Sequence, residues 1–217
     1  WVLGAPEMLL TPGHGLFARI AAHTAEARRV VLFARVDSLS PEVGDMTVTP
    51  AALVVLSECI RDDAAETLRY FRQQGVSLKI ISGDNPATVA AIARSVGFEV
   101  DGGADMRDVG DTADDVIEVV TRHSVFGRVS PQQKRSMVQA LQSRGEVVAM
   151  TGDGVNDVLA LKQADIGVAM ENGAPATKAV AQMILLDGRF SRLPSVLAEG
   201  RRVIANVERV ANLFIVK

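Results

Sequence analysis

Two carboxylates and two glycines lie close together directly after an apolar run. The run is Val147 to Met150, and Gly152, Asp153, Gly154 and Asp157 follow it. An apolar run that ends in a glycine-rich turn is typical of a buried parallel strand, and α/β proteins bind ligands at the carboxyl ends of such strands. Carboxylate oxygens suit Mg²⁺, which proteins usually hold with one or two carboxylates and a phosphate. The same residues also occur as a plain Gly-Asp turn, so the motif alone leaves both interpretations open.

Two other places in the sequence could neutralise or bind a phosphate. Ser82 and Gly83 follow a second apolar run, so a hydroxyl and a backbone N–H could meet phosphate oxygens there. Lys134 lies one turn inside a helix that begins at Pro131, so its charge could reach the same side of a sheet. A serine in this place is equally typical of a helix cap, and most lysines are solvated.

The elements that would position these residues alternate between helix and strand from residue 58 onward. This alternation predicts an α/β fold, a Rossmann-like parallel sheet with helices on both faces. The predicted strands are 76–81, 125–129, 147–150, 166–170 and 184–186. The predicted helices are 62–74 or 63–74, 86–96, 112–122, 131–143 and the segment after Asn156.

Residues 1–55 follow a different pattern. Apolar residues recur at helical spacing between Leu16 and Arg29, and apolar strands are predicted at 30–34 and 51–56. A polar loop is predicted at 38–45. We therefore expect this segment to be part of a separate α/β unit.

Composition restricts the class of protein. The chain has 217 residues, of which 48% are hydrophobic and 23% charged, so a folded core is expected. The net charge of −3 gives no electrostatic reason to expect nucleic acid as a partner. Cys59 is the single cysteine, so no disulfide can form within the chain. The sequence opens on Trp1 without a leader, and we expect it to be part of a longer protein.

The motifs together resemble the P-type cation-transporting ATPases of the haloacid dehalogenase-like superfamily. The stretch Thr151 to Met170 is similar to the hinge motif of that family, and residues 4–7, Gly-Ala-Pro-Glu, resemble an element beside the adenosine. The resemblance implies a haloacid dehalogenase-like fold and three parts. These are the end of a nucleotide-binding domain at 1–55, a phosphorylation domain at 56–192, and a stalk helix at 193–217 that leads to a membrane segment.

The resemblance also implies roles for single residues, with Mg²⁺ and ATP as cofactors. It implies Asp153 as a Mg²⁺ ligand, Asp157 as a second or indirect ligand, Lys134 as the phosphate clamp and Ser82 as a hydroxyl donor. The positions it implies for nucleotide binding are Gly4, Arg29, Arg61, Gly83, Asp84, Arg128 and Asn156. Of these, Arg128, Arg61 and Asp84 match positions that meet nucleotide or help to join domains, and Asn156 matches one that orders its loop.

The sequence departs from the family pattern in three places. Leu3 stands where a lysine usually precedes the Gly-Ala-Pro-Glu element, and the element that ends at Arg61 keeps only its acid and its arginine. No Asp-Lys-Thr-Gly-Thr stretch, which carries the phosphorylated aspartate in the family, occurs in the chain. We therefore expect that aspartate upstream of Trp1 and no ATP turnover by this chain alone, with Asp45 as a distant alternative.

The implied function is ATP-driven cation transport across a membrane through an aspartyl-phosphate intermediate. Ca²⁺ is the cation that the overall resemblance favours, the parent protein is expected in the cell membrane, and this segment is expected in the cytoplasm. A soluble haloacid dehalogenase-like phosphatase is the alternative enzyme, because those proteins carry a similar Gly-Asp-Gly-x-Asn-Asp element. A regulatory or nucleotide-binding module without catalysis also stays open, because the nucleophile is absent.

The segment after Pro194 keeps a helical period of apolar residues to Phe214. By periodicity this predicts an amphipathic helix, which could pack on the sheet as a terminal helix. The family resemblance implies instead a stalk. The final apolar run is far shorter than the ~20 residues that a membrane-spanning helix needs.

Overall fold

The computed structural model describes residues 1–37, 47–57, 59–100, 102–110 and 112–215. The chain forms two compact units, each assembled from segments that are distant in sequence. Unit 1 comprises Trp1–Ile60, Ile80–Arg107 and His123–Arg128, and unit 2 comprises Arg61–Lys79, Asp108–Arg122 and Val129–Lys217.

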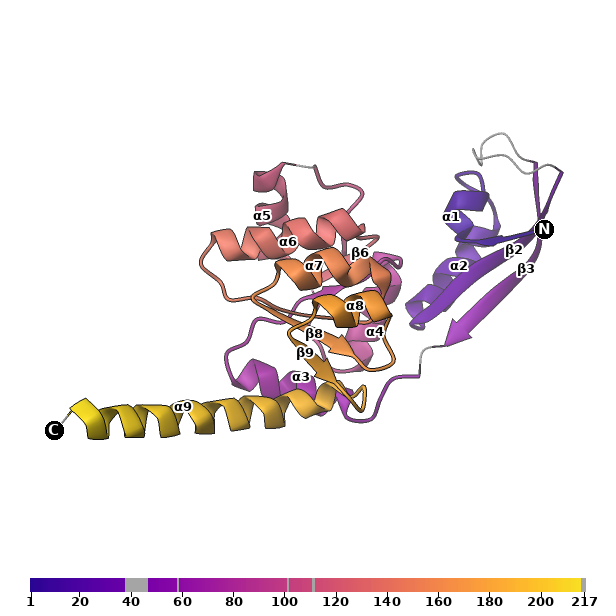
Figure 1. Ribbon diagram of the computed structural model, residues 1–217. Helices are drawn as coiled ribbons and strands as arrows, with labels where there is room; N and C mark the ends of the chain where they lie inside the picture. The colour runs from indigo at the N-terminus through magenta and orange to yellow at the C-terminus, as the bar shows by residue number, and fades with distance from the viewer. Residues whose placement is uncertain (38–46, 58, 101, 111, 216–217) are drawn as a thin grey trace. The chain divides into compact units, whose positions relative to one another are not determined.

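Unit 1 begins with an antiparallel sheet covered by two helices. Its strands are β1 (Val2–Gly4), β2 (Arg28–Val36) and β3 (Val48–Ser57), in the order β1-β2-β3. The helices α1 (Pro6–Leu9) and α2 (Leu16–Ala25) lie on one side of these strands (Figure 1). Alternate residues of β2 are buried against them, as the period of a half-buried strand requires. The two strands predicted here are present and longer than predicted, and β1 was not predicted.

Unit 1 also contains a parallel sheet of short strands. These are β4 (Ile80–Ile81), β6 (Val125–Gly127) and β5 (Ala104–Asp105), in the order β4-β6-β5. Helix α4 (Pro86–Ser95) packs against β6. It begins where the Asn85 side chain accepts a hydrogen bond from the Ala87 N–H, and Gly97 follows its end with φ of 75°.

Unit 2 holds a second parallel sheet flanked by helices. Its strands are β7 (Ala149–Gly152), β8 (Ile166–Met170) and β9 (Met183–Leu185), in that order. Its helices before the last are α3 (Ala64–Gln73), α5 (Ala113–Arg122), α6 (Pro131–Ser143), α7 (Val158–Gln163) and α8 (Pro175–Val180). Apolar side chains of α6, α7 and β7 form a shared core around Ala160, which is fully buried. Parallel strands flanked by helices confirm the predicted α/β class.

Two predicted strands are shorter in the structure and a third is shifted along the chain, for reasons found in the local backbone. The Val76 N–H closes the end of α3 on the Phe71 carbonyl, so the strand predicted from Val76 starts only at Ile80. The Val148 N–H donates to the Asp165 carboxylate, and β7 starts at Ala149 and ends at Gly152, two residues later than predicted at each end. Arg128 has φ of 53°, which ends β6 at Gly127. The polar loop predicted at 38–45 lies outside the described residues.

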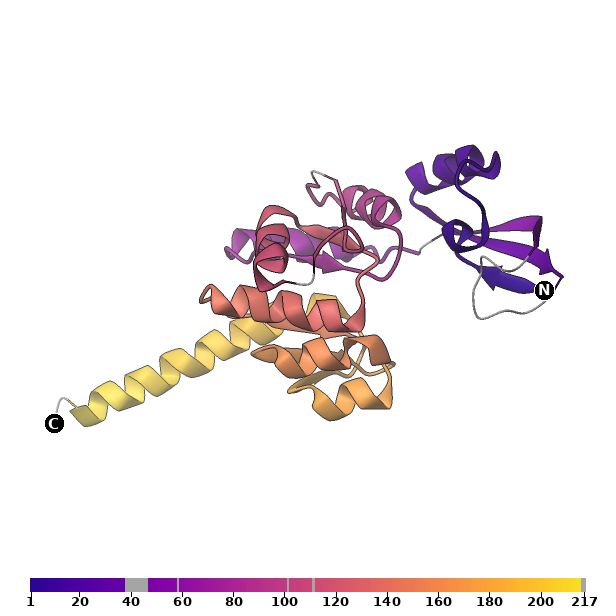
Figure 2. The ribbon, with the colours of Figure 1, turned by 90° about the horizontal axis from the view of Figure 1, so that it is seen from above.

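The last helix, α9 (Leu193–Ile215), extends away from the other elements of unit 2 in both views (Figures 1 and 2). It contacts α3 and the short turn η3 (Phe190–Arg192) near its start. There the Arg201 guanidinium donates to the Gln74 side chain over 2.6 Å. Beyond this point its apolar side chains, such as Val207 and Phe214, are exposed. Packing of the whole helix on the sheet, one of the two interpretations of its sequence, is therefore wrong.

Within the described part of the chain, no helix is long and apolar enough to cross a membrane.

Candidate functional site

The loop after β7 carries the aspartates of the sequence motif. Gly152 ends the strand, the short turn η2 (Val155–Asp157) follows, and α7 begins directly afterwards. A Cβ atom at Gly152 would lie 2.6 Å from the Asp157 Cβ, so only glycine lets Asp157 fold back over the strand end. The loop after β8 fixes the backbone of Asp153, because the Ala174 N–H donates to the Asp153 carbonyl over 2.7 Å.

Lys134 of α6 forms an ion pair with Asp157 of this loop. The Lys134 Nζ lies 2.6 Å from the Asp157 Oδ1, and each side chain is only 11% exposed. The Gly154 N–H donates to the other carboxylate oxygen, Oδ2, over 3.2 Å. The capping box of α6, formed by Ser130 and Gln133, sets the start of the helix that carries Lys134. The structure therefore brings together two residues that are 23 positions apart and that the sequence analysis singled out.

The donor set of this loop fits a magnesium ion bound together with a phosphate. Both oxygens of Asp157 already accept hydrogen bonds from nitrogen. Asp153 is exposed, and within the described residues its carboxylate has no hydrogen-bond or ion-pair partner. No group of three or more His, Cys, Asp or Glu side chains is gathered for a metal among the described residues. One available carboxylate beside a phosphate is an arrangement that Mg²⁺ uses in proteins.

Ser82 and Asp84 form a tight turn in unit 1. The Ser82 N–H continues the β4 ladder by donating to the Phe126 carbonyl, and the Ser82 Oγ accepts from the Asp84 N–H over 3.1 Å. The N-cap of α4 is Asn85, so the alternative of Ser82 as the helix cap is wrong. The Arg29 guanidinium lies 3.1 Å from the Asp84 carboxylate, which brings two of the predicted nucleotide positions together.

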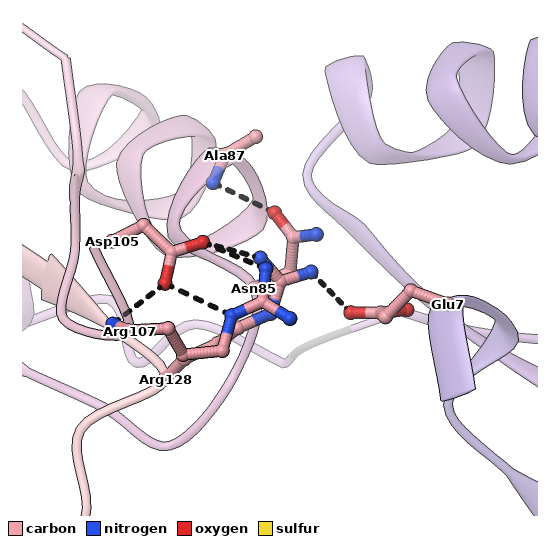
Figure 3. A network of polar contacts seen from close by, with 6 residues as sticks. All are labelled: Glu7, Asn85, Ala87, Asp105, Arg107 and Arg128. Atoms are coloured by element: carbon pink, nitrogen blue, oxygen red, sulfur yellow. Dashed lines mark hydrogen bonds and ion pairs between the residues drawn. The ribbon is translucent and has the colours of Figure 1, made fainter. Parts of the chain in front are cut away.

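Arg128 lies at the centre of a polar network in the same unit (Figure 3). Its backbone N–H donates to the Asp84 carbonyl over 2.8 Å. One terminal amino group, Nη1, lies 2.6 Å from the Asp105 Oδ2, and the other, Nη2, binds the Glu7 carboxylate. Asp105 also accepts two side-chain hydrogen bonds and a backbone hydrogen bond from Arg107. Asp105 and Arg107 were not predicted as site residues from the sequence, because neither belongs to a motif.

Protonation of the network follows from these contacts. Burial opposes the charge of Asp105, but the hydrogen bonds from Arg107 and Arg128 lower its pKa from 3.8 to about 2. Burial likewise opposes the charge of Glu7, and its hydrogen bond from Arg128 makes its pKa lower than usual. The pKa of Arg128 is raised, because the two carboxylates outweigh the effect of burial. All three groups are therefore charged at neutral pH.

The lowered pKa of Asp105 predicts a stability that depends on pH. A carboxylate whose pKa falls on folding stabilises the folded state above pH 4, and this contribution is lost as the pH falls toward 2. We expect Asp105→Asn to lower the free energy of unfolding by about 2 kcal/mol at pH 7 and by much less near pH 2. Urea unfolding of the 217-residue chain at both values measures this. Asp108→Asn, at an exposed aspartate, is the control, and a pH-independent loss in Asp105→Asn would contradict the assignment.

The other predicted nucleotide-binding positions lie outside the network around Arg128. Gly4 ends β1 opposite Leu32, and a Cβ atom there would lie 3.1 Å from the Leu9 Cδ1. Gly83 is exposed with open space around it, so its surroundings do not require glycine. Arg61 is exposed in unit 2, in the turn before α3, and Asn156 is exposed in η2.

The chain matches a known protein family. The family model for haloacid dehalogenase-like hydrolases matches residues 2–165. The chain is 51% identical over 218 aligned residues to the calcium-transporting ATPase CtpE of Mycolicibacterium smegmatis, covering all of this chain and 27% of that protein. It is 40% identical to the probable cation-transporting ATPase exp7 of Streptococcus pneumoniae, covering 99% of this chain and 28% of that protein. The chain thus spans about a quarter of the length of these relatives.

A solved structure shares the fold. The crystal structure of a zinc-transporting PIB-type ATPase aligns with a TM-score of 0.61 over 91% of this chain and 27% of that one. The sequences are 24% identical, so this likeness concerns the fold alone.

Proposed function

Because the chain belongs to the haloacid dehalogenase-like hydrolases, as the corresponding region of a P-type cation-transporting ATPase, we propose that it serves ATP-driven cation transport through an aspartyl-phosphate intermediate. In this proposal the chain is the second half of the cytoplasmic ATP-hydrolysing region. Residues 1–55 end the nucleotide-binding domain, 56–192 form most of the phosphorylation domain, and 193–217 form a stalk. The name of the mycobacterial relative supports Ca²⁺ as the transported ion.

The observation that carries the proposal is the buried pair of Lys134 and Asp157 beneath a loop that exposes Asp153. A phosphoryl group needs positive charge at its oxygens, and Lys134 supplies one such charge at a fixed place. Asp157 holds the ammonium group, and Asp153 is left to bind Mg²⁺, which when bound would neutralise phosphate charge. Ser82 belongs to unit 1, where its hydroxyl lies in the turn after β4, and it is proposed as a phosphate donor on the family resemblance.

We assign the nucleotide to positions in unit 1. The Arg29 guanidinium pairs with the Asp84 carboxylate, and the Arg128 backbone N–H donates to the Asp84 carbonyl, so two positively charged residues are anchored at one turn. Such charges suit nucleotide phosphates or the oxygens of a ribose. Gly4 and Gly83 are proposed to allow close approach of the backbone to the nucleotide. Arg61 and Asn156 belong to unit 2, and they are proposed as nucleotide positions on the family resemblance alone.

The phosphorylated aspartate is proposed to lie upstream of Trp1 in the intact protein. The test is phosphoenzyme formation from γ-labelled ATP with Mg²⁺, comparing the intact protein with the 217-residue chain. We expect acid-stable, hydroxylamine-sensitive label on the intact protein and none on the chain alone. Label on the chain alone would make Asp45 the first candidate nucleophile. Release of phosphate without label would favour the soluble phosphatase, and binding of ATP without label or turnover would favour a nucleotide-binding module.

A further inference from the structure

Arg128 is anchored at three points, and the three are not equivalent. Its backbone is fixed by the left-handed φ of 53° and by the hydrogen bond to the Asp84 carbonyl. Gly127 permits this close approach, because a Cβ atom there would lie 2.4 Å from the backbone N and Cα atoms of Pro86. The guanidinium then extends between two carboxylates, Asp105 and Glu7 (Figure 3).

Asp105 is the permanent partner. Its carboxylate accepts from Arg128 over 2.6 Å and also accepts three hydrogen bonds from Arg107, one from the backbone and two from the guanidinium. It lies on β5, whose register with β6 places it opposite Gly127, the neighbour of Arg128. Exchange of Asp105 for another ligand would break several interactions at once. Asp105 therefore fixes the direction in which Arg128 presents its second amino group.

Glu7 is the exchangeable partner. It belongs to α1, a helix of four residues, and its carboxylate binds the Nη2 amino group of Arg128. Its side chain is 28% exposed, compared with 17% for Asp105 and 17% for Arg128. A carboxylate at the edge of solvent that accepts its side-chain hydrogen bond from one guanidinium can be replaced by another anionic oxygen at small cost.

We propose that Glu7 is an internal competitor for nucleotide, whose carboxylate occupies the amino group through which Arg128 would bind an anionic nucleotide oxygen. Nucleotide binding then includes the exchange of one carboxylate for a ligand oxygen at Arg128, while Asp105 keeps the guanidinium in place. The intrinsic affinity of the site is lowered by the strength of the Glu7 contact. This inference rests on the proposed function, since it takes a nucleotide as the ligand of Arg128.

The experiment is ADP binding to the intact protein, measured by isothermal titration calorimetry. We expect Glu7→Gln to bind ADP about fivefold more tightly than the unmodified protein, because the neutral amide competes less for a guanidinium. The matched control is Glu26→Gln, which removes an equal charge from the same unit at an exposed pair with Arg28. It should leave the affinity unchanged. A gain in affinity cannot come from partial unfolding, so loss of structure would not imitate the expected result.

A second pair of variants tests whether the gain acts through Arg128. Glu7→Gln in an Arg128→Gln background should bind no more tightly than Arg128→Gln alone, as a double-mutant cycle requires for a shared contact. Unchanged or weaker binding by Glu7→Gln, in a protein that does bind ADP, would overturn this inference and leave the proposed function standing. Absence of ADP binding by the unmodified protein would overturn both.

Discussion

Asp153→Ala is expected to lower phosphoenzyme formation in the intact protein at least ~100-fold while leaving ADP affinity within about threefold. Asp153 is exposed, and its carboxylate is without a partner among the described residues, so its removal breaks no internal contact. The variant should consequently keep its stability within ~0.5 kcal/mol. The loss would arise because the Mg²⁺ beside the phosphate loses its direct carboxylate ligand. The measurement is acid-stable label from γ-labelled ATP, with ADP calorimetry in parallel.

Asp114→Ala is the matched control for this variant. Asp114 is also an exposed aspartate of unit 2, but it lies in the first turn of α5, away from the loop after β7. We expect normal label from it. Normal label from Asp153→Ala would show that the metal is not bound at Asp153, and the assignment of the site would then fail.

Lys134→Met is expected to destabilise unit 2 by about 3 kcal/mol. The substitution leaves Asp157 buried without its cation, and an uncompensated buried charge commonly costs ~3–5 kcal/mol. We take the lower end because each side chain keeps 11% exposure. Urea unfolding of the 217-residue chain, followed by far-ultraviolet circular dichroism, measures the change. Lys162→Met, at an exposed lysine of α7, should change the free energy of unfolding by less than ~0.5 kcal/mol.

The double variant Lys134→Met/Asp157→Asn separates the two contributions. It removes the unpaired charge, and an amide oxygen can still accept the hydrogen bond from Gly154. We therefore expect it to be more stable than Lys134→Met alone by about 1–2 kcal/mol. Equal stability of the single and double variants would mean that Asp157 does not depend on Lys134 in the folded protein.

Local sequence signals predicted the elements around the aspartate loop well. Ser130 and Pro131 predicted the start of α6, and the apolar run 166–170 predicted β8 with the observed bounds. Both signals act within a few residues, through a helix cap or a continuous buried strand. The strands at 76–81 and 125–129 were predicted too long, because a neighbouring helix end and the backbone of Arg128 take N–H groups that extended strands would need.

The network around Arg128 could not be predicted in the same way. Glu7 and Arg128 are 121 positions apart, and Asp105 and Arg128 are 23 apart. Pairing over such distances depends on the order of strands in the sheet, which a single sequence does not contain. The pair of Lys134 and Asp157 is just as distant as the second of these, yet both residues were singled out, because each lies in a recognisable motif. Motifs identify candidate residues, and the fold determines their partners.

Because α9 is held near its start, a tilt there would displace its far end. The helix has 23 residues and is held near its start by the contact of Arg201 with Gln74 and through the neighbouring rings of Phe190 and Phe71. The part of the helix beyond Arg201 extends roughly 21 Å, so a tilt of about 10° at that contact would move the far end by about 4 Å. A small adjustment of α3, which holds the helix at Arg201, would thereby become a larger displacement at the far end of α9.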